Sequence, residues 1–334
     1  MQLKMAWRNL WRNQRRTGLT VAAIGLGLMV LIVMVSFTEG MKEIMVEQIA
    51  KSSMGHIQIH HPEYLEKKTT TLVMRDATRL TRLVSEVEGV QAVSSRLLFS
   101  GSIRSNTAST VRVVKVSAVD PELELTFSAL PDKVAEGGFV TRPAAAIKPD
   151  APLRDRLMKG ILIGRKLADQ LKAGLGSKVR VSTAGFDGAP AAAGFFVTGI
   201  LETGTDAFDK HLVMVSLKDM QKATGAGDAA HEISIMAEPG HDLDELSARI
   251  EAAVERQNAG GTMGPVQVLP WYKVMPDIKQ MLDMFDAWNG VLYLLMLVIL
   301  SAGILTTMFM VVFERKREFG VRMALGTSPA SLFG

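Results

Sequence analysis

Two long stretches without a charged side chain constrain the fold of this sequence more than any other feature. Residues 17–38 and residues 287–313 contain no Asp, Glu, Lys or Arg. At a rise of about 1.5 Å per residue, the shorter stretch would form a helix of about 33 Å, which is enough to cross a hydrocarbon core of about 30 Å. We therefore expect two transmembrane helices, with residues 39–286 folded on one side of the membrane.

The first apolar stretch could instead be a secretory signal peptide, because a basic segment precedes it. Its apolar core is longer than the roughly 7–15 residues of a signal peptide, and no Ala-x-Ala-like cleavage site follows Phe37. These two features favour an uncleaved signal anchor.

The distribution of charge predicts the orientation. Residues 1–16 carry five bases and no acid, and residues 314–334 carry four bases and two acids. Since Lys and Arg concentrate on the cytoplasmic side, both ends are predicted to be cytoplasmic and residues 39–286 to lie on the far side of the membrane. The ends account for more than the whole net charge of +4, so the basic isoelectric point comes from membrane flanks and no nucleic-acid partner is expected.

Aromatic and basic residues mark the predicted membrane interfaces. Residues 1–16 are predicted to form an amphipathic helix that lies at the cytoplasmic headgroups. Indole and phenol rings favour this depth in the bilayer. The predicted interface residues are Trp7, Arg8, Trp11 and Arg12 at this helix, and Trp288 and Tyr293 near the outer end of the second span.

Both spans are predicted to continue outward as helical stalks. Residues 39–50 keep the spacing of apolar residues that is typical of a helix, and Pro276 begins a helical pattern that leads into residues 287–313. We therefore expect the chain to have a lipid bilayer as a partner and to hold its domain on two helices.

The segment around residues 54–60 changes to a period of two. Ile57 and Ile59 alternate with polar residues, which predicts a half-buried strand whose polar face lies in water. His56, His60 and His61 could be metal ligands, but their spacing suits a helix and not a strand, so we interpret them as solvated strand histidines.

The rest of the segment between the spans predicts an α+β domain. Asp242 and Glu245 have capping-box spacing and begin a helix. Helices are expected at residues 78–88, 164–173 and 242–260, and strands at residues 90–95, 97–102, 111–119, 161–163, 178–182, 195–201, 212–216, 233–236 and 266–269.

A short amphipathic segment follows the second span. Glu314 and Glu318 fall on one side of a helix, with basic and aromatic residues on another, and Gly326 is expected to end it. Ser328 and Pro329 then predict the start of a further helix. On general grounds, basic residues after an apolar span need do no more than fix its orientation.

Residues 314–329 nevertheless resemble the coupling helix of bacterial ABC-transporter permeases of the FtsX-like, MacB and lipoprotein-releasing (LolC/LolE) type. The family pattern reads Glu-Arg-x-Arg-Glu-Phe-Gly-Val-x-x-Ala-Leu-Gly-x-x-Pro, and residues 6–13 also resemble the start of such permeases. The resemblance implies that this segment binds a cytoplasmic ABC ATPase. The implied contact residues are Glu314, Arg315, Arg317, Glu318, Phe319, Gly320, Arg322, Leu325 and Gly326.

The resemblance also implies an α+β multi-pass protein of the bacterial inner membrane, with a MacB-like periplasmic core domain at residues 39–286 that is interrupted by a β-rich subdomain at residues 137–230. It implies a second permease subunit, as a homodimer or heterodimer, and a periplasmic carrier or adaptor as a further candidate partner. Lipoprotein release, lipid transport and efflux are the implied functions. Family members carry two further membrane helices, so residues 330–334 are expected to begin the approach to a third helix and the sequence to be a truncated form.

No recognisable motif predicts catalysis or a cofactor. The sequence contains no Cys, no His-Glu-x-x-His, no Gly-x-Ser-x-Gly and no Walker motif, so ATP hydrolysis is expected on a separate chain. The alternative is a two-helix membrane sensor with a periplasmic ligand-binding domain. An anchored hydrolase is a weaker alternative because a catalytic motif is lacking.

Overall fold

The computed structural model describes residues 14–106, 110–140, 159–258 and 261–326. The chain divides into two compact units. The helical unit comprises residues 1–45 and 277–334, and the globular unit comprises residues 46–276. The predicted helices at residues 1–16 and beyond residue 326 lie largely outside the described residues.

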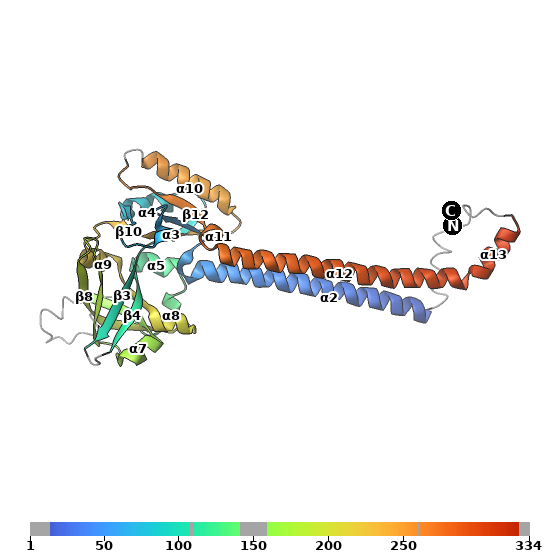
Figure 1. Cartoon of the computed structure of the whole chain (residues 1–334), viewed down its shortest axis with the longest axis horizontal. Helices are drawn as coiled ribbons and strands as arrows, with labels where there is room; N and C mark the ends of the chain where they lie inside the picture. Colours follow the sequence, from blue (N-terminus) through green and yellow to red (C-terminus); the bar gives the residue numbers. More distant parts are fainter. Residues whose placement is uncertain (1–13, 107–109, 141–158, 259–260, 327–334) are drawn as a thin grey trace. The chain divides into compact units, whose positions relative to one another are not determined.

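The described residues of the helical unit form two long helices and a short one (Figure 1). They are α2 (Gln14–Ile49), α12 (Pro276–Glu314) and α13 (Lys316–Ala324). Both long helices are long and apolar enough to cross a membrane, and most of their apolar side chains are exposed. Each extends beyond its charge-free stretch, so the predicted helical continuations at residues 39–50 and from Pro276 are confirmed.

The two long helices run side by side in opposite directions. Lys42 Nζ lies 2.5 Å from Asp286 Oδ1, and a Cβ placed on Gly27 would lie 3.0 Å from Leu300 Cδ2. The first pair joins residues near the C-terminal end of the first charge-free stretch and the N-terminal end of the second. The second pair brings the helices together about four turns further in, because a helix turn contains about 3.6 residues.

One half of the globular unit is a four-stranded antiparallel sheet in the order β12-β1-β11-β3. Helices α4 and α10 cover one face, and their leucines and valines share an apolar core with the strands. This order, with the helices after the first and third strands, is the βαββαβ arrangement of ferredoxin-like folds. Its elements are β1 (Ile57–His60), α4 (Ala77–Ser85), β3 (Val90–Ser105), β11 (Glu232–Ala237), α10 (Leu243–Gln257) and β12 (Gln267–Pro270).

The other half is a closed barrel of six strands. From β3 the pairing runs through β4, β9, β6, β8 and β7, and β7 pairs with β3 again. The interior holds the main apolar cluster, to which helices α7 and α9 contribute Leu167, Leu171, Leu217 and Met220. The added elements are β4 (Val111–Val119), β6 (Lys159–Gly164), α7 (Arg165–Leu171), β7 (Lys178–Ala184), β8 (Pro190–Leu201), β9 (Leu212–Ser216) and α9 (Leu217–Thr224).

Short elements connect and cover the two halves. Residues 130–140 pack an apolar cluster onto the outside of the barrel through Leu130, Phe139 and Val140. The elements are η2 (Ala50–Met54), α3 (Tyr64–Lys67), β2 (Met74–Arg75), α5 (Pro121–Phe127), η3 (Pro131–Lys133), β5 (Val134–Gly137), α8 (Asp206–His211), β10 (Ala229–Ala230) and α11 (Trp271–Val274).

Strand β3 belongs to both halves. Its residues 90–96 pair with β11, and its residues 96–104 pair with β4. The sequence predicts two strands here, whereas the structure has one, because a single 16-residue strand passes from the sheet into the barrel. The proposed subdomain at residues 137–230 keeps its boundaries as a prediction. Its strands share the barrel with β3 and β4, which precede it in the chain.

The polar face of the sheet is buried, which corrects the prediction of solvated strand histidines. Gln58 and His60 are 2% and 1% exposed, and His56 and His61 are partly exposed. The face is covered because α5, which the sequence analysis did not predict, packs against β3 on that side.

Candidate functional site

The segment predicted to couple to an ATPase forms its own helix, α13. Helix α12 ends at Glu314, and Arg315 leaves helical geometry with φ −96° and ψ 4°. The amide of Phe319 donates to the carbonyl of Arg315 at 3.0 Å, which closes the first turn of α13. The break at Arg315 therefore separates a nine-residue helix from the long apolar helix before it.

Helix α13 buries none of its side chains. Val321 is 61% exposed and Leu325, just after the helix, is 81% exposed, while Phe319 is partly exposed. Charged side chains lie among them: Arg317, Glu318 and Arg322 are exposed. Apolar side chains exposed together with charges on one short helix are typical of a protein interaction surface.

Gly326 lies just after α13, in agreement with the prediction that this glycine ends the helix. This glycine has φ +89°, where an L side chain would be strained, and its amide donates to the carbonyl of Met323 at 3.0 Å. Gly320 lies inside the helix, and a Cβ placed on it would meet no atom within 4 Å. Packing within the described residues therefore does not explain the glycine at position 320. Ser328 and Pro329 lie outside the described residues.

The structure describes two of the predicted membrane-interface residues. Trp288 is 60% exposed and Tyr293 is partly exposed, and both lie on α12. These exposures leave both rings accessible to a bilayer. Trp7, Arg8, Trp11 and Arg12 lie outside the described residues.

The sequence analysis did not identify an ion cluster between the two long helices. Lys42 Nζ contacts Glu39 Oε1 at 2.9 Å and Asp286 Oδ1 at 2.5 Å. The i,i+3 pair of Glu39 and Lys42 just after the first apolar stretch was a local signal. The partner Asp286, one residue before the second stretch, was not predictable without the pairing of the helices.

In the described ranges, His, Asp and Glu form no group of three or more that could hold a metal ion. His60 Nε2 lies 3.3 Å from Gln58 Oε1, and burial lowers the pKa of His60 to about 4. Another histidine beside strand β1 makes a hydrogen bond to the backbone: His56 Nδ1 accepts from the amide of Ala237 at 3.1 Å.

Comparison with known proteins identifies the class. The chain combines two apolar helices with a large α+β domain, and in both respects it is similar to ABC-transporter permeases of the FtsX-like and MacB type. The family model of the MacB-like periplasmic core domain matches residues 17–253, so the chain belongs to that family.

Three curated relatives are similar to the chain over different shares of their length. The lipoprotein-releasing system transmembrane protein LolC of Xylella fastidiosa is 26% identical over 177 residues, which is 52% of this chain and 41% of LolC. The macrolide export ATP-binding/permease protein MacB of Rhodospirillum rubrum is 22% identical over 99% of this chain and 48% of MacB. The ABC transporter permease YknZ of Bacillus subtilis is 22% identical over 98% of this chain and 78% of YknZ. The chain thus spans less than half the length of LolC and MacB.

Two solved structures are also similar to the chain. The extracellular domain of YknZ from Gram-positive bacteria matches 64% of this chain and 98% of its own, with 15% identity and a TM-score of 0.43. The periplasmic region of MacB from Actinobacillus actinomycetemcomitans matches 68% of this chain and 94% of its own, with 10% identity and a TM-score of 0.44.

Proposed function

We propose that this chain is a transport permease subunit that converts ATP hydrolysis in a cytoplasmic ABC ATPase into movements of a periplasmic domain. In this proposal residues 17–38 and 287–313 cross the inner membrane, residues 39–286 are periplasmic with a β-rich insertion at 137–230, and residues 314–329 contact the ATPase. Both ends of the chain are then cytoplasmic.

The exposed surface of α13 is the observation that carries the proposal. Val321 on the helix and Leu325 just after it are more than half exposed, and no residue of the helix is buried by the rest of the described chain. Apolar side chains cost free energy in water, about 25 cal/mol per Å2 of exposed surface, so a partner that covers them gains by binding. The break at Arg315 supports the proposal because it lets a partner hold α13 separately from the membrane helix.

We assign ATP hydrolysis to a partner chain. The names of LolC and YknZ describe a transmembrane protein and a permease, whereas the name of MacB joins ATP binding and permease in one protein. The present sequence has no Walker motif to bind nucleotide. A second permease subunit completes the proposed assembly.

The substrate class is proposed from the relatives. The name of LolC refers to lipoprotein release and that of MacB to macrolide export. We propose an amphiphilic substrate that is moved outside the cytoplasm or extracted from the outer leaflet, with a periplasmic carrier or adaptor as acceptor.

The test compares two sets of substitutions on one helix. In the full chain, Glu318→Ala with Phe319→Ala is expected to abolish stimulation of the partner ATPase and its co-purification. The matched control Lys316→Ala changes an exposed residue of the same helix outside the resemblance pattern and is expected to leave both unchanged. Full stimulation in the double variant would contradict the proposal.

A further inference from the structure

One face of the four-stranded sheet carries many polar residues that are nevertheless buried. Ladder partners lie on the same face, and the register pairs Gln58 with Ser234, His60 with Glu232, and Glu232 with Arg96. The six polar residues Gln58, His60, Ser94, Arg96, Glu232 and Ser234 are each at most 9% exposed. Burying polar groups costs free energy unless they are paired, so this face requires an explanation.

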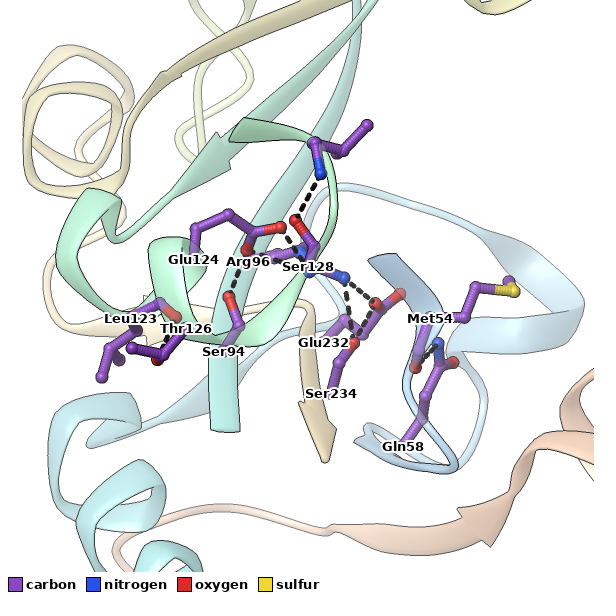
Figure 2. A network of polar contacts seen from close by, with 11 residues as sticks. Met54, Gln58, Ser94, Arg96, Leu123, Glu124, Thr126, Ser128, Glu232 and Ser234 are labelled. Carbon is purple, nitrogen blue, oxygen red and sulfur yellow. Dashed lines mark hydrogen bonds and ion pairs between the residues drawn. The ribbon is translucent and has the colours of Figure 1, made fainter. Parts of the chain in front are cut away.

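Arg96 is the centre of the polar face (Figure 2). Its Nη2 donates to both carboxylate oxygens of Glu124 at 2.9 Å, and its Nη1 lies 3.3 Å from Glu232 Oε1 and 3.1 Å from Ser234 Oγ. Glu124 is 0% exposed and also accepts from Ser94 Oγ at 2.6 Å. One buried guanidinium therefore binds two carboxylates from different elements, α5 and β11.

Arg96 also lies where the two halves of the globular unit meet. It pairs with Glu232 of β11 on one side of β3 and with Val119 of β4 on the other. Helix α5 begins directly after β4, with the Asp120 side chain accepting from the amide of Glu122 at 3.1 Å. The ion pair with Glu124 therefore links α5, which follows the barrel strand β4, to β3 of the four-stranded sheet.

The same cluster also contacts η2, the π-helical turn that follows α2. The guanidinium carbon of Arg96 lies 5.0 Å from the ring centroid of Phe127, and Phe127 packs with Ala50 of η2 and with Met236. The amide of Ala129 donates to the carbonyl of Lys51 at 3.1 Å.

A residue of the polar face also binds the C-terminal end of η2. Gln58 Nε2 donates to the carbonyl of Met54 at 3.0 Å. Gly55, with φ +71°, allows the backbone to turn here, and a Cβ on it would lie 2.6 Å from the carbonyl oxygen of Ile235. Short π-helical segments occur often at functional sites.

Stability alone is a poor explanation for this cluster. Replacing buried ion pairs by apolar residues of similar size is often neutral or stabilising, and their best-attested use is to fix one arrangement among several. Here two carboxylates share one guanidinium, and Arg96 Nε is buried with no acceptor among the described residues.

We propose that Arg96 is a positioning residue that holds η2, the four-stranded sheet and the barrel in one fixed arrangement. A displacement of η2 then moves both halves of the globular unit together. That an ATPase causes this displacement is part of the proposed function and depends on it. The claim that Arg96 fixes the arrangement does not depend on the proposed function.

The test measures distances in the full chain. The sequence has no Cys, so pairs of introduced cysteines can be spin-labelled without background. Gln48→Cys on α2 is paired either with Glu251→Cys on α10 or with Lys218→Cys on α9, all three being exposed positions. With Arg96 present, both distance distributions are expected to be narrow. With Arg96→Met, both are expected to become at least twice as broad, and Arg96→Lys should restore part of the narrowing.

Two further variants keep the test decisive. Arg112→Met removes an arginine that binds Gln170 on the exposed surface of the barrel, and it should leave both distributions unchanged. If Arg96→Met does not fold, the triple variant Arg96→Met, Glu124→Leu and Glu232→Leu removes every charge of the cluster and is expected to fold with broad distributions. Narrow distributions in a folded variant without Arg96 overturn the inference.

Adding the partner ATPase separates the two proposals. In the parent chain, both distances are expected to stay unchanged when nucleotide is added, because the proposed arrangement is fixed. A nucleotide-dependent change of either distance in the parent overturns the positioning role. Failure of the parent chain to stimulate the partner ATPase contradicts the proposed function instead, and the widths of the distributions then decide the role of Arg96.

Discussion

Lys42 Nζ and Asp286 Oδ1 lie 2.5 Å apart and join α2 to α12, shortly after the first apolar stretch and directly before the second. The same ammonium contacts Glu39 at 2.9 Å, and the side chain of Lys42 is 18% exposed. Charged groups at this position fix the register of two otherwise apolar helices, since sliding either helix by one turn separates the charges.

Removing this ion pair is expected to cost little stability. Asp286 is 54% exposed, and partly exposed pairs contribute about 0–1 kcal/mol. A double-mutant cycle with Lys42→Ala and Asp286→Ala should therefore give a coupling free energy below about 1 kcal/mol in the full chain. A coupling of several kcal/mol would show that water does not screen the pair.

Substitutions at the two glycines of α13 are expected to have opposite effects. Gly320→Ala meets no neighbour and should stabilise the helix by roughly 1 kcal/mol, because alanine is the better helix former. Gly326→Ala forces a side chain into φ +89° and should destabilise the helix end by about 1 kcal/mol or more. Amide hydrogen exchange of Leu325 and Gly326 in the full chain should slow in the first variant and accelerate in the second. Equal exchange in both would contradict this account of the helix end.

The globular unit is expected to lose stability in mild acid. Burial lowers the pKa of His60 and of His231 to about 4, whereas an unfolded histidine titrates near pH 6.5. Below pH 6.5 the unfolded chain binds protons that the folded chain does not, so stability falls as the pH drops from about 6.5 to about 4. Each group contributes up to about 3 kcal/mol over this window.

Thermal unfolding of the full chain at pH 7.5 and pH 5 tests this pH dependence. His60→Gln should reduce the difference between the two pH values, and His61→Gln, at the partly exposed neighbour, is the control. An identical pH dependence in the parent and in His60→Gln would contradict the assignment to His60.

Removing one carboxylate from the buried cluster around Arg96 should cost much more stability than removing the ion pair of Lys42 and Asp286. Glu124→Gln leaves Glu232 as the one carboxylate that pairs with the guanidinium of Arg96. This change is expected to destabilise the globular unit by about 3 kcal/mol. Asp120→Ala removes only the cap of α5 and should cost about 1 kcal/mol. The two unfolding temperatures measured side by side provide the comparison, and equal losses would count against a central role for Glu124.

The sequence predicted those elements whose signals are local. Asp242 accepts from the amides of Asp244 and Glu245 as its spacing predicts, and α10 follows with its apolar face buried. The family model that matches residues 17–253 confirms the recognition of the class. For α13 the stop at Gly326 was predictable, whereas the break at Arg315 has no signal in residue type.

The errors share one physical cause, which is contact between distant residues. The alternation around Ile57 and Ile59 gives the two faces of the strand correctly, but it cannot reveal that α5 covers the polar one. The Asp120 cap followed by Pro121 was a usable signal for α5. That Arg96, Glu124 and Glu232 meet depends on the pairing of β3 with β11, which local patterns do not contain.

The most direct test of the central claim uses a photo-crosslinking amino acid at Leu325, which is 81% exposed just after α13. The full chain is irradiated in its native membrane, and the crosslinked partner is identified by mass spectrometry. The same group at exposed Glu251 on α10 is the control for nonspecific capture. The account predicts a crosslink from position 325, and not from position 251, to a protein with an ATP-binding domain. Crosslinks from position 325 to lipid alone would contradict the claim that α13 contacts an ATPase.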